Sequence, residues 1–374
     1  MSAAGLSSQE RLSRRKAVTG GRSSRPLALV TGATGFIGGH LVETLLARGY
    51  AVRAFARDEA RAAGSLPEGV QVVLGDVRDA DSLRAAMVGV DLVFHAAAAV
   101  GLWGRWRWFQ QATVQGTEKA VRAAQEAGVR RFVHFSSVAV YREDALTAGP
   151  VRETAPLTGG RWTGAFGFYG RSKMLAERAA FRHHSDRGTG VTVLRPAWVY
   201  GPRDDSILPY LRLYLKTPLA PWLGQSDPVM PFVYVTDVAE AAVLAAETEG
   251  AAGRPYNLAG PGYPLRDFLW ELADGLGARV PSFRIPQVLA RAAALAVETW
   301  ALPLSPWLAP PLTPSALALL ERGVQVDCSR ARRELGWAPR VPMTEGLDAT
   351  LEWLRTEERR RRPGQAGARA ARGA

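Results

Sequence analysis

Short apolar runs alternate with amphipathic stretches through the first half of the chain. The stretch from Phe36 to Leu46 carries apolar residues at helical spacing, whereas the run from Tyr50 to Phe55 is rich in aromatic and β-branched residues. The runs with the length of buried strands are 28–30, 51–55, 70–74, 92–95, 132–135 and 191–194. Strands that alternate with helices predict an α/β fold with a parallel, doubly wound sheet and helices on both of its faces.

Three glycines, Gly32, Gly35 and Gly38, follow the first apolar run. Because glycine has no Cβ atom, backbone N–H groups at such positions can approach a pyrophosphate at the N-terminus of the next helix. A glycine trio between a strand and an amphipathic helix is typical of a dinucleotide-binding βαβ unit. The sequence therefore predicts a dinucleotide site at the end of the first strand.

Tyr169 and Lys173 are four residues apart, so both side chains project from one face of a helix. We expect the ammonium to lower the pKa of Tyr169 and make this residue a proton donor or acceptor near neutral pH. The pair follows the strand 131–135, which ends in Ser136 and Ser137, whose hydroxyls are placed to reach a carbonyl oxygen beside the cofactor. The alternative is an ordinary amphipathic helix with a solvated lysine.

With these motifs the chain resembles the extended short-chain dehydrogenase/reductase family, and its C-terminal part resembles the 3β-hydroxysteroid dehydrogenase-like branch. The resemblance covers about residues 26 to 355. The matching segments are 31–38, 75–77, 95–97, 135–141, 169–173, 194–204, 310–314 and 326–341. One departure is Thr113, where the family usually carries asparagine, and it puts a helper hydrogen bond in doubt.

The resemblance implies a catalytic trio in which Ser137 orients the substrate oxygen, Tyr169 transfers its proton and Lys173 also bonds the nicotinamide ribose. It implies no metal ligand, and His95 is interpreted as a packed histidine. Asp76 would lie against the adenine ring, although the position also suits a turn residue or helix cap. The implied cofactor contacts are Gly32, Thr34, Gly35, Phe36, Ile37, Gly38, Asp76, Val77, Ala96, Ala97, Tyr169, Lys173, Pro196 and Val199.

The end of the second strand bears on the choice of cofactor. An acid there binds the ribose 2′-hydroxyl of NAD, whereas an arginine accepts the 2′-phosphate of NADP. The segment Arg53–Asp58 has no acid on the strand and places Arg57 about twenty residues after the glycines. We therefore expect Arg57 to bind the cofactor and NADP(H) to be favoured. NAD(H) remains the alternative, with Asp58 folding back to the ribose.

Prolines and aromatic residues become dense beyond Gly201, and short elements such as 232–235 are separated by turns. This pattern predicts a smaller substrate-binding lobe after the Rossmann domain. The expected segments are a disordered basic tail at 1–25, the NAD(P)-binding domain at 26–200, a mainly substrate-binding part at 201–355 and a second basic tail at 356–374.

Two features indicate an apolar substrate. The loop 101–109 places three tryptophans within six residues, beside two arginines, where they could cap a flat apolar molecule, meet a lipid interface or pack against the lobe. The stretch 299–320 has no charge, but its prolines exclude a continuous membrane-spanning helix. It is interpreted as a hydrophobic lid, as a contact dipping into a membrane surface, or as a buried hairpin over the substrate pocket.

The net charge of +12 lies mostly in the tails, because residues 1–25 hold six Lys or Arg and one Glu, and 355–374 hold seven Arg and two Glu. A nearly neutral core argues against a nucleic-acid partner, and the tails suit either solvent or anionic lipid. The single Cys328 fits a reducing compartment, and residues 1–25 have no apolar signal region. We expect a cytoplasmic protein, with peripheral contact to anionic membranes and a homodimer as options.

These patterns favour an NAD(P)-dependent oxidoreductase that interconverts a secondary hydroxyl and a ketone on a sterol-, hopanoid- or 3-oxoacyl lipid-like substrate. A dehydratase is disfavoured because the run Ser137–Ala139 lacks the paired Asp and Glu that such enzymes need. A sugar-nucleotide epimerase of the same fold and a non-catalytic NADP-sensing regulator are the alternatives.

Overall fold

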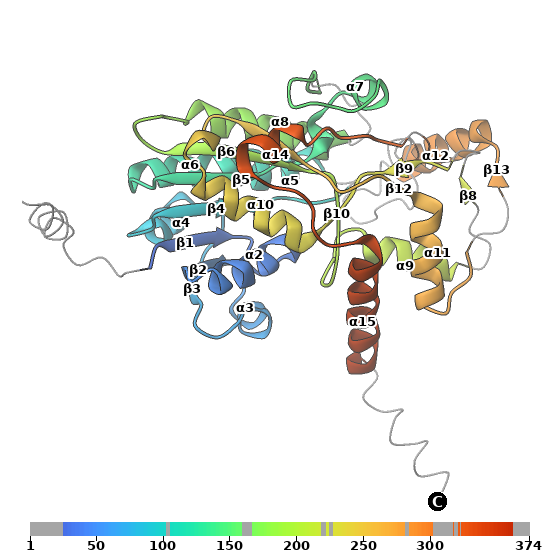
Figure 1. The fold of residues 1–374 in the computed structure, drawn as a ribbon, viewed down its shortest axis with the longest axis horizontal. Coiled ribbons are helices and arrows are strands. Elements are labelled where there is room, and N and C mark those ends of the chain that lie inside the picture. The colour runs from blue at the N-terminus through green and yellow to red at the C-terminus, as the bar shows by residue number, and fades with distance from the viewer. Residues whose placement is uncertain are drawn as a thin grey trace, which may run out of the picture.

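The computed structural model describes residues 25–101, 105–158, 167–217, 222–223, 227–280, 284–301, 317, 321 and 323–361. Within these residues, a parallel sheet of seven strands forms the centre of the molecule, in the order β11-β6-β5-β4-β1-β2-β3 (Figure 1). The strands are β1 (Leu27–Thr31), β2 (Ala51–Ala56), β3 (Gln71–Leu74), β4 (Leu92–His95), β5 (Arg131–Phe135), β6 (Gly190–Pro196) and β11 (Pro255–Leu258). The order reverses between β1 and β4, which is the switch point where doubly wound sheets bind ligands.

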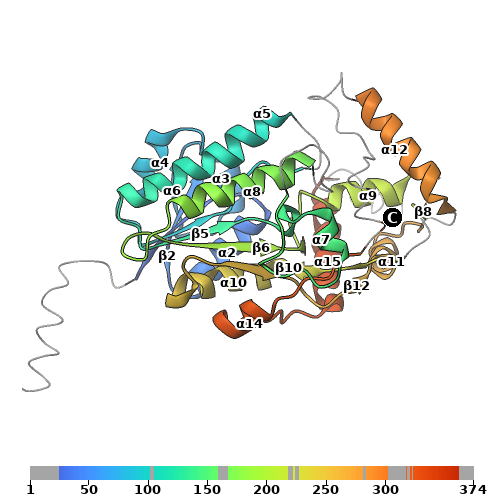
Figure 2. The ribbon, with the colours of Figure 1, turned by 90° about the horizontal axis from the view of Figure 1, so that it is seen from above.

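Helices cover both faces of this sheet (Figure 2). The helices α2 (Phe36–Ala47) and α10 (Val235–Glu247) pack on one face, and α14 (Ser329–Leu335) covers β11. The other face carries α4 (Ala80–Met87), α6 (Gly116–Glu126) and α8 (Gly167–Arg182). Shorter helices connect the layers: α3 (Glu59–Ser65), α5 (Trp106–Phe109), α7 (Glu143–Thr147), a π-helical turn (Gln110–Gln115) and 3₁₀ turns at Val138–Val140 and Glu249–Ala251.

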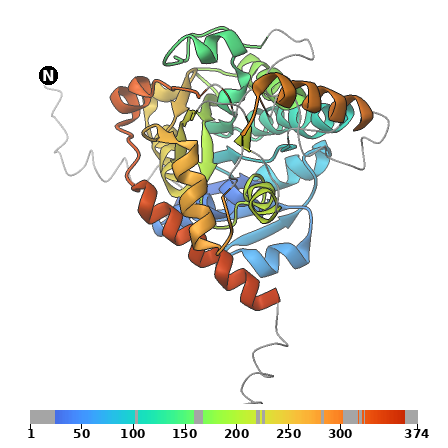
Figure 3. The same cartoon turned by 90° about the vertical axis from the view of Figure 1, so that its right-hand side faces the viewer.

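A smaller lobe follows β6 and has its own aromatic core. Its strand pairs join β7 (Trp198–Tyr200) to β10 (Phe232–Tyr234), β9 (Val229–Met230) to β12 (Tyr263–Pro264) and β8 (Trp222–Leu223) to β13 (Arg284–Ile285). The helices are α9 (Leu208–Lys216), α11 (Leu265–Gly275), α12 (Gln287–Ala301) and α15 (Met343–Arg361). Figure 3 shows α11 and α15 side by side, and the stacked rings of Phe232 and Phe268, 4.2 Å apart, fill the core beneath them.

A buried ion pair ties α8 to the sheet. The Arg195 guanidinium on β6 donates to both carboxylate oxygens of Glu177, at 2.9 and 2.6 Å, and to the Tyr141 hydroxyl at 2.9 Å. Tyr141 donates in turn to Asn257 on β11. Both charged side chains are almost fully buried, so each is stable there only because the other is present.

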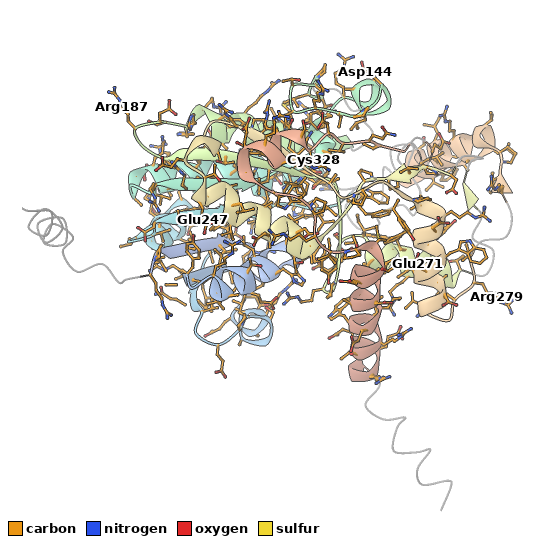
Figure 4. All side chains as sticks on the ribbon, in the orientation of Figure 1. Asp144, Arg187, Glu247, Glu271, Arg279 and Cys328 are labelled. Carbon is orange, nitrogen blue, oxygen red and sulfur yellow. The ribbon has the colours of Figure 1, made fainter. Side chains whose placement is uncertain are left out.

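Cys328, labelled in Figure 4, lies buried at the start of α14. Its Sγ accepts a hydrogen bond from the Ala259 backbone N–H at 3.1 Å. Burial raises the pKa of the thiol to about 12, so the reactive thiolate is disfavoured near neutral pH.

The α/β fold and the alternation of strands and helices are confirmed. Two expectations about segments need correction. The strand β11 and the helix α10 lie within 201–355 but belong to the central sheet and its covering layer. Residues 356–361, expected in the basic tail, continue α15 through Arg361, because the helix packs its apolar side against the lobe core through Leu347, Leu351 and Leu354.

Candidate active site

The glycine loop between β1 and α2 has the geometry of a pyrophosphate cradle. Gly32 has φ of +70°, and a Cβ atom there would lie 2.9 Å from the Ala97 nitrogen. At Gly38, a Cβ atom would lie 2.0 Å from the Gly32 carbonyl oxygen. The helix α2 begins at Phe36 with no side-chain cap and no acid in its first turn. Its N-terminal N–H groups and dipole therefore suit an anion, as a dinucleotide requires.

Arginine and aspartate side chains lie at the ends of β2 and β3. Asp76 forms an ion pair with Arg78 at 2.7 Å and accepts the Arg78 backbone N–H at 2.8 Å, so it does serve as a turn residue. The hydrogen bond from Arg78 is the largest cause that lowers the pKa of Asp76, and the charge of the exposed Arg57 adds to it. Asp58 caps α3 by accepting the Arg61 backbone N–H at 3.0 Å. Because the charge of Arg57 affects the pKa of Asp76, the two side chains lie near each other at the ends of β2 and β3.

The expected trio comes together where β5 ends against α8. Tyr169 and Lys173 project from the N-terminal half of α8, with the Lys173 Nζ 5.9 Å from the Tyr169 ring centroid. Nζ donates to the Phe135 carbonyl oxygen at 2.8 Å, which places the ammonium at the end of β5. Ser137 follows two residues after Phe135, and its hydroxyl hydrogen-bonds Tyr169. The spacing in the sequence therefore corresponds to one cluster of side chains.

The electrostatics of Tyr169 differ from the expected ones. Burial raises its pKa above the ordinary value, and the hydrogen bond with Ser137 acts in the opposite direction without reversing it. The expectation of a lowered pKa is therefore wrong in this structure, because the ammonium is directed at a backbone carbonyl. Burial also lowers the pKa of Lys173 to about 8. A phenol that stays protonated at neutral pH suits the donor of a proton.

Next to this cluster, His95 and Thr113 have structural hydrogen bonds. His95 is buried, and its ring nitrogens lie 2.8 Å from the Thr31 hydroxyl and 3.1 Å from the Thr117 hydroxyl. The Thr113 hydroxyl, in the π-helical turn, accepts the Ala99 backbone N–H at 3.0 Å. Thr113 thus binds the loop after β4, and His95 is a packed histidine.

Aromatic side chains from the tryptophan-rich loop pack against the start of α8. The Trp106 ring lies 5.6 Å from the Phe168 ring, beside Tyr169, and the Arg171 guanidinium lies 4.7 Å from the Trp106 centroid. Phe109 is buried beneath them. The spacing of these residues had not identified Phe168 or Arg171. Residues 102–104 and most of the uncharged stretch 299–320 lie outside the described residues.

The other expected cofactor residues line two parts of the fold. Ala96 and Ala97 approach Gly32 so closely that no side chain fits between them. Val77 packs against Gly116, where a Cβ atom would lie 3.1 Å from its side chain. Thr34 and Gly35 directly precede α2, Phe36 and Ile37 begin it, and Pro196 ends β6. Val199 lines a small apolar cavity of the lobe with Trp198, Leu211 and Phe232.

Comparisons with known proteins identify the family. The model of the NAD dependent epimerase/dehydratase family matches residues 28–259. A 4-hydroxy-2-methyl-3-oxo-4-farnesyl-3,4-dihydroquinoline-1-oxide ketoreductase from Stigmatella aurantiaca is 35% identical, over 86% of this chain and 94% of the relative. A 3 beta-hydroxysteroid dehydrogenase/Delta 5→4-isomerase from Mycobacterium tuberculosis is 32% identical, over 87% of this chain and 89% of the relative.

Among solved structures, MoeE5 in complex with UDP-glucose and NAD has a TM-score of 0.68 and 26% identity, over 88% of this chain and 99% of that one. These relatives point to the same family as two features of the structure. The features are the glycine cradle and the cluster of Ser137, Tyr169 and Lys173. The chain therefore belongs to the NAD dependent epimerase/dehydratase family, in its 3β-hydroxysteroid dehydrogenase-like branch.

Proposed function

We propose that this NAD(P)-dependent oxidoreductase interconverts a secondary hydroxyl and a ketone on a sterol-, hopanoid- or 3-oxoacyl lipid-like substrate, with Ser137, Tyr169 and Lys173 as its catalytic residues. The observation that carries the proposal is the convergence of these side chains at the carboxyl end of β5, on the same edge of the sheet as the glycine cradle. The relatives that reduce ketones or oxidise steroid hydroxyls support the apolar substrate class.

Each residue has a defined task in the reduction. A nicotinamide dinucleotide held at the glycine cradle would supply the hydride for the new C–H bond at the carbonyl carbon. The Ser137 hydroxyl orients the carbonyl oxygen, and the protonated Tyr169 donates its proton to that oxygen. Lys173 holds a positive charge beside the phenolate that forms, which offsets the cost of a buried anion. Oxidation of the alcohol reverses these steps.

The enzymatic alternative is a sugar-nucleotide epimerase, in which the hydride returns to the substrate and no net cofactor is consumed. Trp106 and Phe168, the residue directly before Tyr169, pack together as an aromatic wall at the start of α8, which favours an apolar ring system. In a test with a 3-ketosteroid, a 2-alkyl-3-oxoacyl ester and UDP-glucose, we expect stoichiometric oxidation of NADPH with a ketone. Conversion of the sugar nucleotide without net oxidation would support the epimerase. Cofactor binding without turnover of any compound would support a non-catalytic sensor.

Cofactor preference is expected to depend on Arg57, whose charge lies near Asp76 while Asp58 is engaged in capping α3. Arg57→Ala should weaken NADPH binding by about 10- to 100-fold, because a charge-assisted hydrogen bond of about 1.5 to 3 kcal/mol to the 2′-phosphate is lost. NADH binding should change less than twofold. Fluorescence titration with both cofactors measures the effect, and Arg61→Ala, in the helix that follows Arg57, is the matched control. Equal losses for both cofactors would contradict the NADP assignment.

The lobe carries an exposed apolar helix that suits a lipid surface. Val288, Leu289, Leu295 and Trp300 of α12 are between 60% and 81% exposed, whereas the buried positions among the side chains of α12 that the structure describes are Ala290 and Ala294. Arg279, at the same end of the molecule in Figure 4, and Arg284 add positive charge there. Apolar side chains flanked by arginines are typical of helices that lie in the interface of an anionic membrane. Within the described residues, no helix is long and apolar enough to cross a bilayer.

Leu289→Asp is therefore expected to reduce sedimentation with anionic vesicles about tenfold or more, because a leucine side chain contributes about 1.5 to 3 kcal/mol when buried. Val88→Asp, at a similarly exposed apolar position after α4, should leave sedimentation unchanged. Failure of the parent protein to bind vesicles of any composition would exclude the membrane contact without affecting the proposed reaction.

A further inference from the structure

A layer of buried polar side chains lies directly beneath the catalytic lysine. It lies on the face of the sheet that α6 and α8 cover. His95 on β4 and His134 on β5 are partners in the strand register, and their rings stack with centroids 5.6 Å apart and planes 23° apart. Ser136 directly follows β5, two residues after His134 and on the same face, and all three side chains are at most 4% exposed.

The hydrogen bonds of this layer are incomplete among the described protein groups. Both ring nitrogens of His95 have threonine partners. In contrast, neither ring nitrogen of His134 nor the Ser136 hydroxyl has a partner. Buried polar atoms almost always have a protein or water partner, because leaving them unpaired costs free energy. His134 and Ser136 can therefore bind a nearby donor that has hydrogens without acceptors.

Lys173 is such a group. An ammonium carries three N–H donors, and Nζ gives one of them to the carbonyl oxygen of Phe135, the residue between His134 and Ser136. Burial lowers the pKa of both histidines, and the positive charge of Lys173 lowers it further. Both imidazoles are therefore neutral at physiological pH, and the unpartnered His134 offers one nitrogen as an acceptor.

We propose that Ser136 and His134, through one bound water molecule, accept a second hydrogen of the Lys173 ammonium and fix its position at the catalytic end of α8, which leaves the third hydrogen for the nicotinamide ribose. They act on the reaction through the lysine and are positioning residues. The inference rests on the proposed function only for the role of Lys173. It adds a hydrogen-bonded support beneath that residue which stabilises its charged form.

The charged and titratable groups that face this layer decide in which pH range the effect of the Lys173 charge on its hydrogen bonds can be measured. His95 faces it from β4 and stays neutral, while Arg195 from β6 and Glu177 from α8 form a buried ion pair. Thr117 faces it from α6 and does not titrate. Burial lowers the pKa of Lys173 to about 8 and raises that of Tyr169. Between pH 7 and pH 9.5, roughly the range around that value, Lys173 is the facing group whose charge changes.

A double-mutant cycle between Ser136→Ala and Lys173→Met tests the proposal without cofactor or substrate. At pH 7, Ser136→Ala should change the unfolding equilibrium constant about tenfold more in the Lys173 background than in the Met background, as for a hydrogen bond to a charged group. At pH 9.5 the difference should fall below about twofold, because the neutral amine binds its acceptors weakly. His134→Phe should behave like Ser136→Ala, and His134→Gln, which keeps an acceptor, should retain the coupling.

Thr192→Val is the matched control, because it removes a buried hydrogen bond to the Ala251 carbonyl oxygen on the opposite face of the sheet. It should show no coupling to Lys173 at either pH. If turnover is established, Ser136→Ala should also move the alkaline limb of kcat/KM to lower pH by about one unit, since the ammonium is less stable. A coupling that is absent at pH 7, or that is equal at pH 7 and 9.5, would overturn the proposal. Absence of turnover with the coupling intact would refute the proposed function alone.

Discussion

Tyr169→Phe is expected to lower kcat for ketone reduction by about 10²- to 10⁴-fold while leaving cofactor binding within twofold. The substitution keeps the ring that packs at the start of α8 and removes the proton that the substrate oxygen needs. Because burial raises the pKa of Tyr169, the parent phenol stays protonated across neutral pH, so the loss should appear throughout that range.

Rapid-quench measurement of single turnovers checks this expectation, since it separates chemistry from product release. Phe168→Leu is a matched control, because it alters the adjacent aromatic wall and leaves the hydroxyl in place. The control should change KM for the substrate more than kcat. A Tyr169→Phe rate within a factor of a few of the parent would show that another group donates the proton.

Glu177→Ala is expected to destabilise the protein by about 3 to 5 kcal/mol, because it leaves the Arg195 guanidinium buried without its anion. The hydrogen bonds that hold β11 should weaken as well, since Arg195 also binds Tyr141, which donates to Asn257 on that strand. Urea unfolding followed by circular dichroism measures the change. Glu126→Ala breaks exposed pairs with Arg84 and Arg122 and should cost at most about 1 kcal/mol. Similar losses in the free energy of unfolding for both variants would contradict the conclusion that Arg195 depends on Glu177 for its stability in the core.

Most of the sheet was predictable because each central strand is a run of apolar residues between amphipathic helices. The seventh strand was not, since Pro255–Leu258 contains a proline and Asn257 and is short of apolar residues. This segment becomes a strand because β6 would otherwise expose an edge and because α14 covers it. Asn257 is tolerated there through its hydrogen bonds to Tyr141 and the Val151 carbonyl oxygen.

The site was predictable to the extent that it depends on local spacing. Tyr169 and Lys173 follow from helix geometry, and the glycine trio follows from the strand before it and the helix after it. The direction of the Tyr169 pKa depends on tertiary contacts, because the ammonium donates to Phe135 and not to the phenol. A signal for Glu177 existed, since it lies one helical turn after Lys173. His134, a polar residue in a buried strand, was a similar signal.

The most direct test of the oxidoreductase is hydride transfer itself. The purified protein is incubated with NADPH that carries deuterium at nicotinamide C4, in separate preparations for each face, together with a 3-ketosteroid. Mass spectrometry of the recovered steroid is expected to show one deuterium on the carbinol carbon from one of the two preparations, with one equivalent of NADP⁺ formed. Tyr169→Phe should show this label only at the greatly reduced rate. Recovery of unlabelled ketone from both preparations and from a panel of other apolar ketones would contradict the assignment.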